Sequence, residues 1–155
     1  MKRSLLLFLF GMGAMAQSAS RAQLYSALLT GGVLNPGREL VHFSNTCVLH
    51  IDGLNFPVVD LQELVKSDTS PRGINQIVVL NSLLKPVQEI EYTTQRPLFC
   101  VGNQLYVFGD LDIDNSLPEG NVLTFSHGGK TVTFRHVEAN QYPIPITKDR
   151  KSFPQ

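Results

Sequence analysis

Three aspartates stand at alternate positions in the stretch GDLDIDN, and carboxylates at such spacing can bind calcium. A calcium loop of the EF-hand type needs oxygen ligands at its positions 1, 3 and 5, a glycine at 6 and a glutamate at 12. Asp110, Asp112 and Asp114 meet the first requirement, but Asn115 and Asn121 occupy positions 6 and 12. Alternate residues of a strand are separated by about 6.6–6.8 Å, so they do not surround one ion. The pattern favours the polar face of a strand, with a weak divalent metal site as the alternative.

The four histidines form no metal-binding or catalytic motif; they are His42, His50, His127 and His136. None has the spacing of a zinc-binding histidine pair, and none combines with a cysteine in a zinc pattern. The Gly-x-Ser-x-Gly motif of many serine hydrolases is also absent. We therefore expect no catalytic residue and no cofactor. The alternative is a small enzyme, hydrolase-like or metal-dependent, that is built on loop residues.

The N-terminal residues have the features of an export signal. Lys2 and Arg3 precede a short apolar stretch, which ends before the small-residue pattern Ala14-Met15-Ala16. These features predict a cleaved signal peptide over residues 1–16, with alternative cleavage sites up to about residue 22. The apolar stretch is too short to cross a bilayer, which needs roughly 20 residues. We therefore expect a periplasmic or secreted protein without a transmembrane segment in the mature chain.

The cysteine pair and the charge agree with export and exclude one class of partner. In an exported protein the two cysteines, Cys47 and Cys100, are expected to form a disulfide rather than remain buried thiols. Such a bond would close a loop of about 54 residues, worth roughly 4 kcal/mol from chain entropy. The chain has 13 basic and 13 acidic residues, and losing Lys2 and Arg3 would leave 11 basic residues. A chain that is not basic is not expected to bind nucleic acid.

The elements that must position these residues are predicted to be hairpins. Turn signals occur at Asp52-Gly53, Gly102-Asn103 and Gly128-Gly129, each between two runs of strand-forming residues. Folding about each turn gathers apolar residues on one face, as a correct register should. The predicted pairs are Ile51 with Leu54, Leu49 with Phe56, Cys47 with Val58, Cys100 with Leu105, Leu98 with Val107, Phe125 with Val132 and Leu123 with Phe134. Both cysteines then lie on apolar faces, which favours the disulfide.

Two segments have helical patterns. Residues 21–30 have helical composition and stop at a glycine pair, and residues 59–67 show a short apolar stripe. In the second segment, Asp60 and Glu63 have the spacing of a capping box. Strands are expected over residues 74–80 and 86–94, the latter with its glutamates outward.

The sequence therefore predicts a mainly β fold: an antiparallel β-sandwich or barrel built from hairpins, with one or two short helices. A helix and loop lead-in over residues 17–38 precedes a β-rich domain over 39–138 and an extended, proline-containing tail over 139–155. We expect a noncatalytic binding or assembly module of the cell envelope with an envelope protein as partner. An inhibitor or immunity-type protein is a further alternative. Weak candidates for partner contact are Pro57, Tyr142, Pro143 and Pro145.

Overall fold

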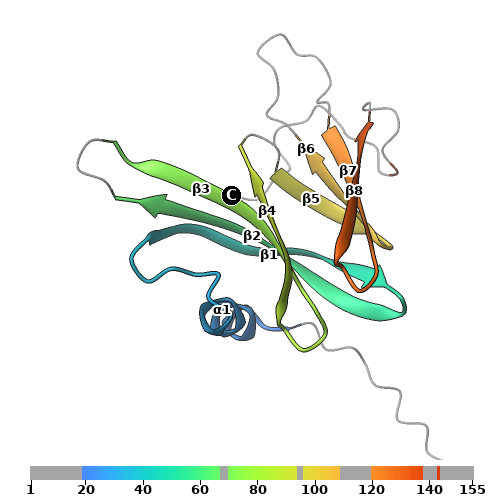
Figure 1. Ribbon diagram of the computed structural model, residues 1–155, viewed down its shortest axis with the longest axis horizontal. Helices are drawn as coiled ribbons and strands as arrows, with labels where there is room; N and C mark the ends of the chain where they lie inside the picture. The colour runs from blue at the N-terminus through green and yellow to red at the C-terminus, as the bar shows by residue number, and fades with distance from the viewer. Residues whose placement is uncertain (1–18, 67–69, 94–95, 109–119, 138–142, 144–155) are drawn as a thin grey trace, which may run out of the picture.

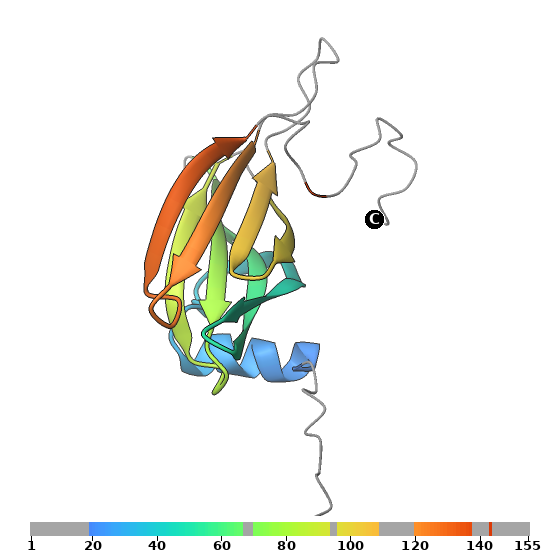
Figure 2. The same ribbon diagram turned by 90° about the vertical axis from the view of Figure 1, so that its right-hand side faces the viewer.

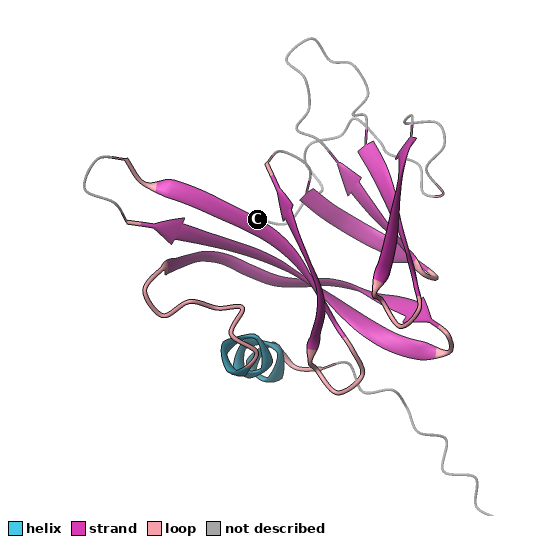
Figure 3. Ribbon diagram, viewed as in Figure 1, coloured by secondary structure: helices cyan, strands magenta, loops and turns pink. Residues whose placement is uncertain are grey.

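The structure, a computed structural model, describes residues 19–66, 70–93, 96–108, 120–137 and 143. These ranges contain one helix and eight strands, which form two antiparallel four-stranded sheets (Figure 1; Figure 3). The predicted mainly β fold is confirmed, and the two separate sheets identify it as a sandwich and not a closed barrel.

The strands follow one another in each sheet in chain order. Sheet A contains β1 (Glu39–Ile51), β2 (Leu54–Val65), β3 (Arg72–Leu80) and β4 (Pro86–Tyr92). Sheet B contains β5 (Arg96–Val101), β6 (Gln104–Phe108), β7 (Gly120–Ser126) and β8 (Thr131–Val137). Figure 2 shows sheet B in front of sheet A, and Figure 1 shows that the far ends of β2 and β3 extend beyond sheet B. One part of the inner face of sheet A is therefore left uncovered by sheet B.

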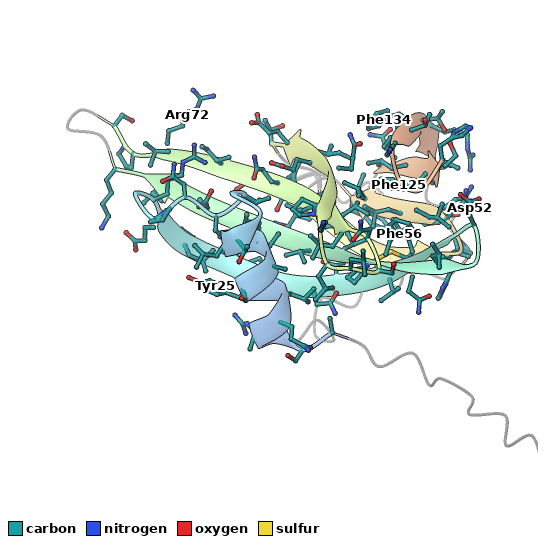
Figure 4. All side chains as sticks on the ribbon, turned by 60° about the horizontal axis from the view of Figure 1, so that its bottom comes forward. Tyr25, Asp52, Phe56, Arg72, Phe125 and Phe134 are labelled. Carbon is teal, nitrogen blue, oxygen red and sulfur yellow. A yellow bond between two sulfur atoms is a disulfide. The ribbon has the colours of Figure 1, made fainter. Side chains whose placement is uncertain are left out.

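The main core lies between the two sheets. Its buried members alternate along the strands with residues of the other face, as the period of two in a strand requires. They are Leu49, Ile51, Phe56, Val58, Ile77, Val79, Leu105, Val107, Leu123 and Phe125. Figure 4 places Phe56 and Phe125 between the sheets, one from each of them.

A second core lies on the opposite face of sheet A, where α1 (Arg21–Thr30) packs (Figure 1). Ser20 begins the helix with a capping box: its side chain accepts from the Gln23 backbone N–H, and the Gln23 side chain accepts from the Ser20 N–H. Leu24 and Leu28, one helical turn apart, are fully buried against the sheet. The predicted helix over residues 21–30 is thus confirmed. Among the described residues, no helix has the length and apolar character needed to cross a membrane.

The predicted helix over residues 59–67 is wrong, because the described part of this segment belongs to β2. α1 covers one face of β2 and sheet B covers the other, so β2 buries apolar side chains on both faces. Val59 and Leu61 face α1, whereas Asp60 alternates with them on the face toward sheet B. A short apolar run of this kind fits helical and strand periods equally well, so pattern alone could not decide.

The predicted registers are confirmed at the first and third hairpins. At the second, Cys100 pairs with Leu105 as expected, but Val107 pairs with Pro97 and not with Leu98. An irregularity between Pro97 and Phe99 moves the register by one residue. Proline cannot donate to the ladder, which is the physical reason for a bulge at this point.

Candidate binding cleft

The sandwich is closed on the side where β1 and β5 meet. The predicted disulfide is present: Cys47 of β1 is bonded to Cys100 of β5, with 5.7 Å between the Cα atoms. Next to it, the backbone N–H of His50 donates to the carbonyl oxygen of Gly102 over 2.7 Å. A covalent bond and a backbone hydrogen bond therefore join the two sheets along this side.

On the other side of the sandwich, bounded by β4 and β8, no described residue joins the two sheets by a strand or a disulfide, and we call this the open side. Among the described residues, β4 pairs only with β3 and β8 pairs only with β7. A cleft of about 690 Å³ lies between the sheets here, which we call the binding cleft. Its described lining residues are Val65, Arg72, Gly73, Ile74, Asn75, Ile77, Ile90, Glu91, Tyr92, Thr93, Val107, Leu123 and Phe134.

The lining of the binding cleft combines apolar walls with a few polar groups. Phe134 lies on the inward face of β8, paired with the core residue Leu123, yet it is 64% exposed. Figure 4 places Phe134 on β8 and Arg72 at the far end of sheet A. Clefts of about 300–1,000 Å³ with apolar walls and a few polar groups are typical ligand sites. The arrangement can therefore hold an apolar group against Phe134 and orient it by hydrogen bonds.

A buried polar network borders the binding cleft. The carboxylate of Asp60 is 7% exposed and accepts a hydrogen bond from the hydroxyl of Tyr92, a residue of the cleft wall. The side-chain amide of Gln62 donates to the same hydroxyl over 3.0 Å. Burial, and then the bond to the Asp60 carboxylate, raises the pKa of Tyr92 well above that of a free phenol. Tyr92 therefore stays protonated and ties β4 to β2 across β3.

His42 and Ser44 complete this network, and a serine, a histidine and an aspartate together invite comparison with a catalytic triad. In a triad the histidine contacts serine with one ring nitrogen and aspartate with the other. Here Nε2 of His42 makes both contacts, at 3.2 Å to the Ser44 hydroxyl and 3.4 Å to the Asp60 carboxylate. The serine is therefore not activated in the way that nucleophilic catalysis requires.

The other buried acid serves the fold. Glu63 is 2% exposed and lies on the opposite face of β2, away from the binding cleft. Its carboxylate accepts from the guanidinium of Arg38 and from the backbone N–H of Asn35, each over 3.1 Å. It thereby fixes the loop that connects α1 to β1.

The structure brings together few of the residues that the sequence suggested as sites. Asp110, Asp112 and Asp114 lie outside the described residues, as do Tyr142 and Pro145, and Pro143 is exposed. Pro57 is buried in the internal strand β2 and does not mark an edge. Pairing of β2 with β3 begins only at Val58, so the missing N–H of Pro57 disturbs no ladder there. Pro57 lines a separate hollow of about 1000 Å³ beside α1.

Sequence reasoning missed two features. The spacing of Asp60 and Glu63 predicts a helix cap, although the alternation of Asp60 with Val58 also fits an inner strand face. Ser82 and Lys85 have the Ser-x-x-Lys spacing of some serine nucleophiles. They lie in the exposed β3–β4 turn, and this motif needs a helix to bring serine and lysine together.

The histidines lie on three different elements: His42 and His50 on β1, His127 in the β7–β8 turn and His136 on β8. His50 contacts the Asn55 side chain over 2.7 Å. Among the described residues, no group of three or more histidine, cysteine, aspartate or glutamate side chains could hold a metal ion. Comparison with family models, with curated protein sequences and with solved structures found no match. Any functional conclusion therefore depends on the geometry of the binding cleft.

Proposed function

We propose that the protein is an exported, noncatalytic binding module of the cell envelope, and that it recognises its partner through the binding cleft. The observation that carries this proposal is the exposure of Phe134 on an inward-facing position of β8. Burying apolar surface stabilises a protein by about 25 cal/mol per Å². Phe134 belongs to the apolar lining of the binding cleft, together with Ile90 and Leu123, and a concave apolar site with a few polar groups is typical of a binding site.

Export is supported by the disulfide, because such bonds persist in oxidising compartments. The capping box at Ser20 also bears on the cleavage site. Cleavage after Ala16 would leave the cap intact, whereas cleavage near residue 22 would remove it and expose the first turn of α1. N-terminal sequencing of the mature protein is expected to find a terminus at or before Ser20. A terminus within α1 would contradict this part of the proposal.

Two other functions are alternatives to a binding module. A small hydrolase would need the His42, Ser44 and Asp60 group as its centre, and the shared Nε2 contact counts against it. An inhibitor or immunity-type protein would use the same binding cleft and differ only in its partner. The binding module is preferred because it requires nothing beyond the open side of the sandwich.

Site-specific photo-crosslinking in the native envelope tests the proposal. A photoreactive phenylalanine analogue at position 134 is expected to capture a protein partner. The same analogue in place of Leu83, which is 75% exposed in the β3–β4 turn, is the matched control. Capture at 134 and not at 83 would support the binding cleft as the recognition site. Equal capture at both positions, or none at 134, would refute it.

A further inference from the structure

The four edge strands of the sandwich differ in how they are protected. An edge strand presents unpaired N–H and C=O groups, and proteins usually protect it with proline, bulges or charges. β1 has two register irregularities and is joined to β5, β4 begins with Pro86, and β5 contains Pro97 with an irregularity beside it. Each of these three edges therefore has a feature that opposes the pairing of a further strand.

β8 lacks the prolines, irregularities and covalent link of the other three edges, and its charged residue is Arg135. It pairs with β7 at seven consecutive positions without a register shift, and it contains no proline. Its other edge, from Thr131 to Arg135, meets no strand in the described part of the chain. Alternate N–H and C=O groups of this segment point away from β7, because each strand of an antiparallel ladder directs alternate groups to its two sides. Of the four edge strands, β8 therefore has the backbone geometry most suitable for pairing with a further strand.

The chemistry of β8 restricts what can pair with it. The strand contains no acidic residue, carries Arg135 on an exposed position and follows Lys130 in the turn. Its inward-facing Phe134 borders the binding cleft, which Ile90 and Tyr92 line from the opposite sheet. Opposite charges across neighbouring strands stabilise a sheet and like charges destabilise it. A partner strand should therefore direct apolar side chains into the cleft and acidic side chains toward Arg135.

We propose that β8 binds an extended segment of another polypeptide, in which apolar and acidic residues alternate, by strand addition. The segment pairs its backbone with the open edge of β8 and inserts its apolar side chains beside Phe134. This inference rests on the proposed function and names the partner's chemistry. Pairing of β8 with the β8 of a second copy is disfavoured, because it brings basic strands together. The chain's own tail does not have the required charge either, because it is basic, with Lys148, Arg150 and Lys151.

Titration of the mature protein with synthetic peptides tests the proposal. The probe is a capped peptide of about eight residues that alternates valine with glutamate, a length that matches an ordinary strand. The first control alternates valine with lysine. The second is the glutamate peptide with its valine amides N-methylated, and the third is the same peptide with its glutamate amides N-methylated. We expect the glutamate probe to bind and the lysine peptide to bind at least about tenfold more weakly. One of the two N-methylated peptides should lose binding and the other should keep it, because only alternate amides of the peptide would point toward β8.

Protein variants locate the site. Phe134→Ser and Arg135→Glu are each expected to weaken binding of the glutamate probe by about tenfold or more, as truncation of a central contact usually does. Leu83→Ser and Lys85→Glu are the matched controls in the exposed β3–β4 turn, and they should bind as the wild type does. Because Phe134 is exposed, its replacement is not expected to unfold the protein, and circular dichroism will verify this.

Four results would overturn the proposal. Three are equal binding of the two charged peptides, full binding of both N-methylated peptides, and unchanged binding by Phe134→Ser. The fourth is self-association of the wild type in sedimentation that Phe134→Ser abolishes, because a second copy would then occupy the edge. If photo-crosslinking at position 134 captures a partner while the peptide tests fail, strand addition is wrong and the binding function stands. If crosslinking also fails, both are wrong.

Discussion

The two sides of the sandwich are built from similar antiparallel hairpins, but the two sheets are joined on one side and separate on the other. At β1 and β5, the Cys47–Cys100 bond and a backbone hydrogen bond from His50 join the sheets. At β4 and β8, the sheets separate around the binding cleft, and Phe134 is left exposed. The two sides therefore contribute differently to the protein. Because the disulfide holds the β1–β5 side together, the β4–β8 side does not need to be closed by packing and can present an interaction surface.

The largest predicted effect concerns the closed side. Replacing both cysteines, as Cys47→Ala with Cys100→Ala, removes a bond that joins residues 53 positions apart. Loss of this constraint is expected to lower the free energy of unfolding by about 4 kcal/mol, chiefly by releasing the unfolded chain. Urea denaturation measures this value. A loss below about 1 kcal/mol would show that the packed sheets, and not the bond, hold the closed side together.

The next effect concerns the network that ties β4 to β2 beside the open side. Tyr92→Phe removes the hydroxyl that donates to the buried Asp60 carboxylate. At neutral pH this is expected to cost about 2 kcal/mol, as loss of a hydrogen bond to a buried charge usually does. Tyr25→Phe, on the exposed face of α1, is the control and should leave stability nearly unchanged.

The same residue gives the protein a specific alkaline response. The pKa of Tyr92 is raised above its ordinary value of 10.0 by burial and by the bond to Asp60. Above pH 10.0 the unfolded chain loses this proton before the folded chain does, so the free energy of unfolding falls as pH rises. Denaturation at a series of pH values should show a shallower fall for Tyr92→Phe than for Tyr25→Phe. If the free energy of unfolding falls equally steeply with pH in both variants, the pKa of Tyr92 is not raised by folding.

The smallest effect on stability is predicted at the open side. Phe134→Ser should change the free energy of unfolding by no more than about 0.5 kcal/mol, because substitutions at exposed positions rarely do more. Thermal and urea denaturation against Leu83→Ser will check this. A large loss would show that Phe134 is part of the core, and the contrast between the two sides would then disappear.

The sequence predicted the hairpins and the disulfide well, because local turn signals and alternating apolar residues determine both. The predicted register is wrong near Pro97, where a bulge shifts one pair of residues. The predicted helix that includes Asp60 is wrong, since a strand with two buried faces resembles a short helix in its apolar pattern. The binding cleft was beyond prediction, because it depends on how far the two sheets separate. The sequence pattern favours Pro57 as a partner contact and places Phe134, which is 64% exposed, only in a core-facing row.

The most direct test of the contrast between the two sides is amide hydrogen exchange of the mature protein, measured by NMR with and without the glutamate probe. We predict slower exchange at alternate amides of β8 when the peptide is bound, because those N–H groups would gain partners. Exchange in β1 and β5 should not change, since these strands are already joined to each other. Protection at β1 or β5 without protection at β8 would contradict the account.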